Sequence, residues 1–330
     1  MEKKSVTIKD VAKKAGVGVG TVSRVLNNGI VKDETKKRVQ NAIIKLGYKP
    51  NFYAQQLAGG KSRRILVYIP EVKTEFHWRL LDGFDRYLDK KEYFSIVFPL
   101  TDFKRLENMR KTPYTMGGVD GKALFTISPE IFSDEFLTEE PLVLIENESK
   151  KCNSVTVDNI RGGEIAAELL VENNVSDYIF LYSDVDNKII KNNHIEERKE
   201  GFLNFLKNNK IEIPNKNIIY SNYLLGISYN KIIEIFDKYK KPGFFASTDN
   251  FALIVLEVAS TINKVPGKDF FIVGFDNQIW TEKIGLTTIE QPIEEMGQTA
   301  AKLLIEVIED ETRPIKNIKF SPKLIRRKSA

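Results

Sequence analysis

The sequence of 330 residues is poor in the residue types that build covalent and metal sites. It contains one cysteine, Cys152, and two histidines, so it can form no internal disulfide and offers no Cys/His cluster with zinc-ligand spacing. No apolar run approaches the roughly 18 residues that a transmembrane helix needs, and no apolar core follows the first ten residues, MEKKSVTIKD. We therefore expect a soluble, cytoplasmic protein with no membrane partner, no bound metal and no cofactor.

The charge is distributed unevenly along the chain. The net charge of the whole is +5, yet residues 1–64 hold 15 Lys and Arg against 4 Asp and Glu, a net charge of +11. The other 266 residues hold 35 against 41, a net charge of −6. A basic segment of this kind is typical of a module that binds a polyanion, and the phosphates of a nucleic acid are the obvious partner.

Apolar residues at helical spacing predict three short helices in this basic segment. They are Ile8, Val11, Ala12 and Ala15, then Val22, Val25 and Leu26, then Val39, Ala42, Ile43 and Leu46. Thr7 is a suitable N-cap with Asp10 as its capping-box partner, and Gly16 stands where the first helix should end. Two helices joined by a tight glycine-containing turn form a helix-turn-helix, which the third helix, over residues 32–46, would cover from behind.

From residue 64 onward, short β-rich runs alternate with helical patterns. The runs, which we expect to be buried parallel strands, are residues 65–69, 94–98, 123–127, 142–145, 178–182, 243–247 and 270–275. The helices predicted between them are residues 76–88, 162–171, 199–206, 232–239 and 295–308. This alternation predicts an α/β fold of two doubly wound lobes, in which ligands bind beyond the carboxyl ends of the strands.

Residues 6–29, VTIKDVAKKAGVGVGTVSRVLNNG, closely resemble the DNA-reading motif of the lactose-repressor (LacI/GalR) family of bacterial transcription regulators. The resemblance continues through residues 46–51, the AQQLAGGKS linker, residues 272–276 and residues 287–292, and so spans essentially the full length. It implies a homodimer on pseudo-palindromic double-stranded operator DNA. It also implies three parts: a helix-turn-helix headpiece (1–50), a hinge helix with linker (51–63), and a two-lobed effector-binding and dimerisation domain resembling periplasmic sugar-binding proteins (64–330).

The family pattern assigns DNA-binding roles to residues of the first two parts. Val19, Gly20 and Arg24 are its base-facing positions in the second helix. The other DNA-binding residues that the resemblance implies, the first four of them as phosphate contacts, are Thr7, Thr21, Ser23, Asn27, Tyr48, Asn51 and Ala54. Leu57 would wedge into the minor groove, although it could instead pack on the neighbouring lobe. Two residues depart from the pattern: Gly18 replaces the usual Ser or Thr cap, and Gly20 lacks a side chain to read a base.

The resemblance also places effector contacts in the lobes, mostly just after strands. These are Phe76, His77, Asp158, Arg198, Tyr223, Asp249, Asn250 and Asp276. Asp, Asn and Arg match vicinal hydroxyls and aromatic faces stack on a pyranose, so the set suits a sugar or sugar phosphate. Asp158 and Asp249 have helix caps as a less favoured alternative role. The family commonly has Asn-Pro-Phe-Phe after the first strand, where this chain has TEFH at residues 74–77. The residues at the entrance of the effector pocket therefore differ from those of the family.

The predicted function is a repressor of a sugar-utilisation operon whose operator affinity is controlled allosterically by a carbohydrate-like effector. A catabolite-type regulator controlled by a protein partner or a phosphorylated sugar is the first alternative. A sugar-modifying or NAD-dependent enzyme on the lobes is less favoured, because no glycine fingerprint follows a strand and no nucleophile elbow occurs. A secreted binding protein would share the lobes but not the basic segment. We predict no catalytic residues.

Overall fold

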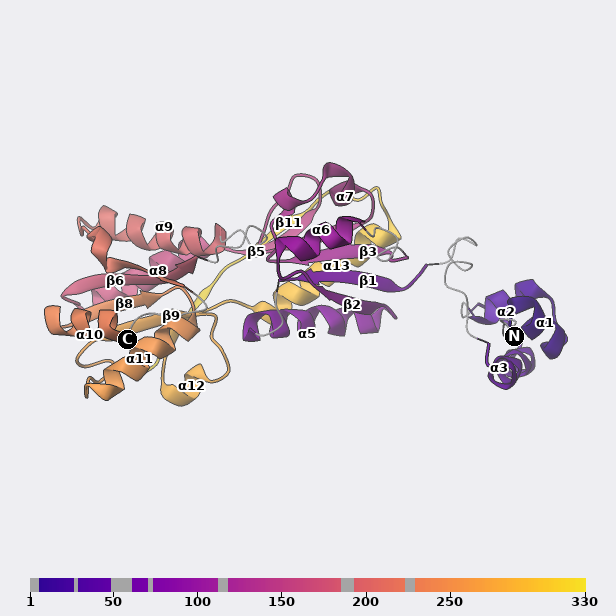
Figure 1. Ribbon diagram of the computed structural model, residues 1–330, viewed down its shortest axis with the longest axis horizontal. Coiled ribbons are helices and arrows are strands. Elements are labelled where there is room, and N and C mark those ends of the chain that lie inside the picture. Colours follow the sequence, from indigo (N-terminus) through magenta and orange to yellow (C-terminus); the bar gives the residue numbers. More distant parts are fainter. Residues whose placement is uncertain are drawn as a thin grey trace. The chain divides into compact units, whose positions relative to one another are not determined.

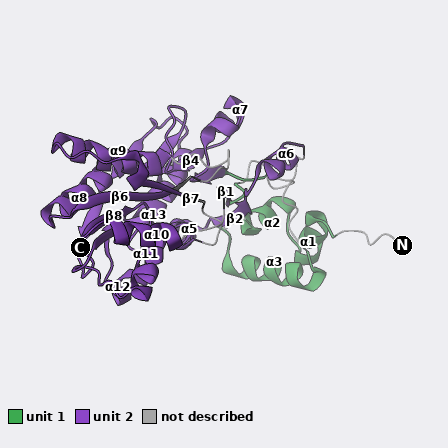
Figure 2. Cartoon of the chain, turned by 60° about the vertical axis from the view of Figure 1, so that its left-hand side comes forward, with its two compact units in different colours: residues 1–63, 117–120 green, residues 64–116, 121–330 purple. Residues whose placement is uncertain are grey.

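The computed structural model describes residues 6–26, 29–48, 61–70, 74–111, 118–184, 193–222 and 229–330. Two compact units are present: residues 1–63 with 117–120, and residues 64–116 with 121–330 (Figure 2). The predicted contacts at Asn27, Asn51, Ala54, Leu57 and Tyr223 lie outside the described residues. Among the described helices, none is both long and apolar enough to cross a membrane.

The first unit contains three helices, α1 (Ile8–Ala15), α2 (Val19–Leu26) and α3 (Asp33–Leu46). The backbone N–H of Thr7 donates to the carboxylate of Asp10 over 2.9 Å, and Gly16 ends α1 in the left-handed conformation with φ +69°. Both features match the sequence-based prediction. The small core of the unit is Val11, Ala12, Ala15, Val22, Val25, Val39 and Ala42, so each helix buries one apolar stripe.

Two six-stranded sheets form the second unit (Figure 1). The first has the order β11-β5-β4-β3-β1-β2, and its neighbouring strands are all parallel. Its strands are β1 (Arg64–Ile69), β2 (Phe94–Pro99), β3 (Gly121–Phe125), β4 (Leu142–Ile145), β5 (Asn153–Val157) and β11 (Asn317–Phe320). We call the part of the chain built on this sheet lobe 1.

The second sheet has the order β12-β10-β9-β8-β6-β7 and is parallel except for the antiparallel pair β10 and β12. Its strands are β6 (Asp177–Asp184), β7 (Ile218–Asn222), β8 (Pro242–Ala246), β9 (Phe271–Phe275), β10 (Thr287–Glu290) and β12 (Lys323–Ile325). We call the part built on it lobe 2. The chain passes between the lobes three times: after β5, after β10 and after β11.

In lobe 1, α5 (Glu75–Lys90) packs directly on α13 (Ile293–Glu309). Glycine makes this approach possible, because a Cβ on Gly83 would lie 2.1 Å from the carbonyl oxygen of Glu294. The lobe also carries α6 (Phe103–Lys111), the 3₁₀ helix η2 (Pro129–Ile131) and α7 (Asp134–Thr138).

Helices cover both faces of the second sheet (Figure 1). On one face α8 (Asn159–Glu172) packs on α9 (Asn193–Asn208), again through glycine: a Cβ on Gly163 would lie 2.1 Å from the carbonyl oxygen of Arg198. The other face carries α10 (Tyr229–Lys238) and α11 (Asp249–Thr261). The 3₁₀ helix η3 (Asn215–Asn217) and α12 (Thr281–Ile284) complete the lobe.

The expectation that residues 94–98 form a buried strand is wrong. This segment is β2 at the edge of the first sheet, where Phe94 is 68% and Ile96 41% exposed. An edge strand is paired on one side only, so its apolar residues need not be covered within one chain. Five further strands, β5, β7, β10, β11 and β12, were not predicted.

Candidate functional site

The exposed face of α2 carries the three positions that were predicted to face bases. Val19 is 41% exposed and Gly20 and Arg24 are exposed, whereas Val22 and Val25 on the opposite side are buried. The Arg24 guanidinium donates to the carbonyl oxygen of Gly20 over 3.4 Å, which directs its side chain back along the start of the helix. The face is therefore open and carries one cation, Arg24, as suits a helix that enters a major groove.

The other predicted DNA contacts described in the first unit lie before, within and after α2 in the sequence. Thr21 and Ser23 are half-buried on α2, and Thr7 is exposed at the start of α1. Tyr48, after the end of α3, packs against the core of the unit. The carbonyl oxygen of Gly18 accepts the N–H groups of Thr21 and Val22, so α2 starts on backbone hydrogen bonds. Roles in DNA binding for these residues remain predictions.

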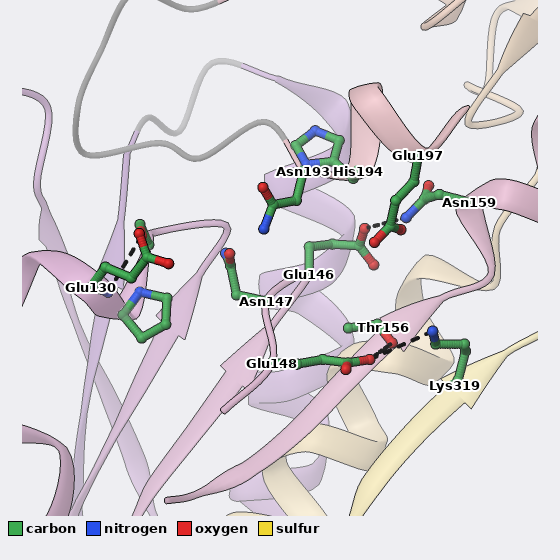
Figure 3. A pocket seen from close by; sticks show the side chains of 12 residues that line it. Glu130, Glu146, Asn147, Glu148, Thr156, Asn159, Asn193, His194, Glu197 and Lys319 are labelled. Atoms are coloured by element: carbon green, nitrogen blue, oxygen red, sulfur yellow. Dashed lines mark hydrogen bonds and ion pairs between the residues drawn. The ribbon is translucent and has the colours of Figure 1, made fainter. Parts of the chain in front are cut away.

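A polar cavity of about 160 Å³ lies between the two lobes (Figure 3). Lobe 1 lines it with the segments that follow β3 and β4 and with residues of β5 and β11. Lobe 2 lines it with the starts of α8 and α9. The polar lining residues are Ser128, Glu130, Glu146, Asn147, Glu148, Thr156, Asn159, Asn193, His194, Glu197 and Lys319. Parallel α/β sheets bind ligands in this position, beyond the carboxyl ends of their strands.

Arg198 of α9 is buried beneath the cavity wall, with 2% of the residue exposed. Its Nε donates to Oδ1 of Asn159 over 2.9 Å, and its Nη1 donates to the carbonyl oxygen of Ser247 over 2.7 Å. The guanidinium lies 3.5 Å from the ring centre of Phe275, and Nη1 is 3.8 Å from the carboxylate of Asp276. One side chain thus links α9, the start of α8 and the ends of β8 and β9.

Glu146 extends this network into lobe 1. Its carboxylate accepts the side-chain amide of Asn159 over 3.3 Å and the backbone N–H of Val157 over 3.1 Å. Burial raises the pKa of Glu146 to about 7, against the opposing effects of Arg198 and these two hydrogen bonds. Asn159 therefore bridges a buried cation of lobe 2 and a buried carboxyl of lobe 1, and relative movement of the lobes would disturb its bond to Glu146.

His77 of α5 is buried and fully hydrogen-bonded. The Thr126 hydroxyl donates to the carbonyl oxygen of Phe125 over 2.8 Å, so Nε2 of His77 donates to Thr126, also over 2.8 Å. Nδ1 then accepts from the hydroxyl of Thr74 over 2.6 Å. This bonding assigns a neutral Nε2–H tautomer. Burial lowers the pKa of His77 to about 4, consistent with a neutral ring.

Titration of His77 should therefore destabilise the protein in acid. The folded pKa near 4 lies below the unfolded value of 6.5, so stability from the neutral ring is complete above pH 6.5 and is lost as the pH falls through 4. The loss should approach about 3 kcal/mol. Urea unfolding of wild type and His77→Gln between pH 7 and pH 4 measures it. His194 and all carboxyl groups are common to both proteins, so equal losses of stability would contradict the assignment.

Two aspartates at the ends of lobe 2 strands behave differently. Asp276 accepts the side-chain amide of Gln291 over 2.6 Å, and burial raises its pKa to about 6 although the Arg198 guanidinium opposes the shift. The Asp249 carboxylate accepts from the backbone of Gln278 and the hydroxyl of Thr288 over 2.8 and 2.6 Å. Asp249 thus connects the start of α11 to the segment after β9 and to β10, while Asp276 belongs to the Arg198 network.

The structure brings only part of the predicted effector set together. Arg198 and Asp276 are in direct contact, and His77 lies close enough to His194 to contribute to lowering the pKa of that residue. Phe76 stacks edge-on with His77 at 5.3 Å between ring centres. The Asp158 carboxylate accepts the N–H of Arg161 over 2.9 Å, which is a cap on α8. Asn250 is half-buried on α11. Effector contacts for the whole set remain predictions.

Sequence reasoning did not single out several residues that line the cavity. Glu146 and Asn147 follow directly after β4, so the rule that polar residues after strands line the ligand site would have found them. His194 and Glu197 lie on α9 and Thr156 within β5, where no local pattern marks them. Within the described ranges, no group of three or more His, Cys, Asp or Glu side chains is placed to hold a metal ion.

A three-helix unit in a basic segment, joined to two mainly parallel sheets with a polar cavity between them, defines a ligand-responsive DNA-binding transcription regulator. Residues 7–51 match the family model for bacterial regulatory proteins of the lacI family, and residues 167–330 match that for the periplasmic binding protein-like domain. The chain belongs to the lacI family of bacterial regulatory proteins. The resemblance seen in the sequence and the expected fold class are thereby confirmed.

Relatives match the chain from end to end. The HTH-type transcriptional regulator RegA of Clostridium saccharobutylicum is 30% identical over 98% of this chain and 98% of its own length. The ribose operon repressor of Bacillus subtilis (strain 168) is 31% identical over 92% of this chain and 91% of its own. The solved lac repressor dimer bound to operator and the anti-inducer ONPF covers 99% of both chains with a TM-score of 0.80 at 21% identity, a likeness of fold.

Proposed function

We propose that the protein is a cytoplasmic, non-enzymatic repressor of a sugar-utilisation operon. As a homodimer it binds a pseudo-palindromic operator through residues 1–50, with residues 51–63 as hinge, and residues 64–330 bind a small carbohydrate-like effector. Similarity to a ribose operon repressor supports a sugar as the effector. Similarity in fold to an operator-bound dimer supports operator DNA as the binding partner. One observation carries the proposal: a polar cavity whose wall is supplied by both lobes.

The mechanism follows from the chain of bonds behind that wall. The guanidinium of Arg198 holds Asn159, and Asn159 holds Glu146 of the other lobe. A ligand that bonds to Asn159 or Glu146 changes the balance between lobe orientations, because it favours the orientation in which both walls reach it. The lobe orientation then alters operator affinity through residues 51–63. Such coupling is worth about 1–3 kcal/mol, or roughly five- to 150-fold in operator affinity.

The DNA-reading role of α2 is tested by replacing Arg24. Arg24→Ala should weaken binding to the specific operator by about 1–3 kcal/mol, since a bidentate contact to guanine is lost, with little change in binding to unrelated DNA. The operator is first obtained by selection from random duplexes with the wild-type protein, and affinities are measured by fluorescence anisotropy. Arg38→Ala on α3, also exposed and also one charge fewer, is the matched control. Equal effects of the two variants would show that Arg24 contributes charge alone.

A further inference from the structure

The charges around the cavity between the lobes are strongly unequal. Among the described lining residues, four are glutamates, Glu130, Glu146, Glu148 and Glu197, and one, Lys319, is cationic. Lys319 is already engaged, because its Nζ lies 3.6 Å from the carboxylate of Glu148. The remaining surplus is negative, and Figure 3 shows the Glu146 and Glu197 side chains close together beside Asn159.

Among the described lining residues, the only cation near these two inner carboxyl groups is Lys319, which already faces Glu148. Glu146 is 5% exposed. Burial raises its pKa to about 7, and burial together with the charges of Glu148 and Asp158 raises the pKa of Glu197 against the opposing effects of Lys319 and Asn159. A shift in this direction means that the surroundings disfavour the ionised form. A positive charge between them would reverse that effect, so a cationic ligand would bind more favourably than a neutral one of equal shape.

The buried Arg198 guanidinium behind the cavity wall is not available to bind an anionic ligand. The Arg198 guanidinium donates to Asn159 and to the carbonyl oxygen of Ser247, stacks on Phe275 and faces Asp276. A phosphate in the cavity would meet the glutamates first and would have to take Arg198 from these partners. Burying an uncompensated anion costs several kcal/mol.

The rest of the lining suits hydroxyl groups. Amide and hydroxyl side chains from both lobes, among them Asn147, Asn193 and Thr156, face the cavity. Nδ1 of His194 is buried and has no hydrogen-bond partner within the described part of the chain. Burial is the main cause that lowers the pKa of His194, to about 3, so the ring is neutral and can bond a hydroxyl. A volume of about 160 Å³ holds one small ring.

We infer that the cavity takes a cationic effector, a single-ring polyhydroxyl compound carrying a protonated amine, as in an amino sugar, in preference to a neutral or phosphorylated sugar. The inference rests on the proposed function of the cavity as the effector site. The ammonium group lies between Glu146 and Glu197, and the hydroxyls bond to the amides and His194.

Matched ligands test the charge preference on the full-length protein. Isothermal titration calorimetry compares glucosamine, galactosamine and mannosamine with their parent hexoses, N-acetyl derivatives and 6-phosphates. At least one amine should bind about tenfold or more tightly than its parent and its N-acetyl form, with the 6-phosphate weakest. In Glu197→Gln and Glu146→Gln the preference should fall below about threefold. The exposed Glu212→Gln is the control and should keep the full preference.

Each other outcome overturns the inference. Equal or tighter binding of a parent hexose or a phosphate would show that charge does not select the ligand, and no binding by any amine would exclude this ligand class. Stabilisation by Ca²⁺ or Mg²⁺ in place of amines would assign the carboxyl groups to a metal ion. Binding to the selected operator is measured separately. Specific DNA binding without amine preference rejects only the inference, whereas loss of specific DNA binding rejects the proposed function itself.

Discussion

Arg198→Met should make operator binding insensitive to any compound that changes it in the wild type, while leaving the affinity for operator itself intact. Removal of the guanidinium leaves Asp276 without its buried counter-charge and Asn159 without the bond that orients it toward Glu146. Breaking a buried ion pair on one side costs about 3–5 kcal/mol, so the two-lobed part of the chain, residues 64–330, which we call the sensor, should also lose stability. The two effects have one cause, which is the loss of the group that joins four elements of lobe 2.

The pH dependence of this variant separates its electrostatic part from lost packing. Without Arg198 the carboxyl groups of Asp276 and Glu146, whose pKa values burial has already raised to about 6 and about 7, can relieve their burial by taking up protons. The loss of stability should therefore be larger at pH 8 than at pH 5.5. Urea unfolding followed by tryptophan fluorescence reports on the sensor, since both tryptophans, Trp78 and Trp280, lie within residues 64–330.

Arg198→Lys is the conservative comparison. It keeps the charge but cannot bond Asn159 and Ser247 at once while stacking on Phe275. We expect it to retain more stability than Arg198→Met and still to lose the effector response. A variant without the guanidinium that responds to effector as the wild type does would remove Arg198 from the mechanism.

Gly163→Ala should destabilise lobe 2 by about 3 kcal/mol or more, a large cost for one methyl group. The added Cβ would lie 2.1 Å from the carbonyl oxygen of Arg198 and 2.8 Å from the backbone nitrogen of Phe202. Both are backbone atoms, so relief requires α8 and α9 to separate. Separation moves the Arg198 side chain relative to Asn159, and the cavity between the lobes should change with it.

Gly20→Ala is the matched control for this substitution. A Cβ on Gly20 would meet no atom within 4 Å, and alanine is the better helix former, so the headpiece should gain up to about 1 kcal/mol. Thermal unfolding of both variants gives the comparison. Close helix packing would not be the reason for glycine at position 163 if the two substitutions had similar effects on stability.

The helix-turn-helix was predictable because its determinants are local. The apolar spacing, the Thr7–Asp10 cap and the end of α1 at Gly16 lie within a few residues of one another, and the structure has all three. Most strands and helices of the lobes were predicted for the same reason. The edge position of β2 was not, because FSIVF is as apolar as a central strand and strand order depends on contacts distant in sequence.

The candidate site was predictable only where strand ends mark it. Arg198 and Asp276 were singled out, and the structure places them in one buried network. Glu146 and His194 were not predicted, because their properties depend on burial and on residues distant in sequence. Glu146 is bonded by Asn159 of the other lobe, and the pKa of His194 is lowered in part by Arg198 and His77. Strand-end reasoning also selected Asp158, whose carboxylate caps α8.

The central claim is that a ligand in the cavity between the lobes controls operator affinity, and one titration tests it most directly. Fluorescence anisotropy of labelled operator is followed while a compound shown by calorimetry to bind the sensor is added. The account predicts that the operator dissociation constant changes by roughly five- to 150-fold in the wild type and stays constant in Arg198→Met. A compound that occupies the cavity of the wild type yet leaves its operator affinity unchanged would contradict the account.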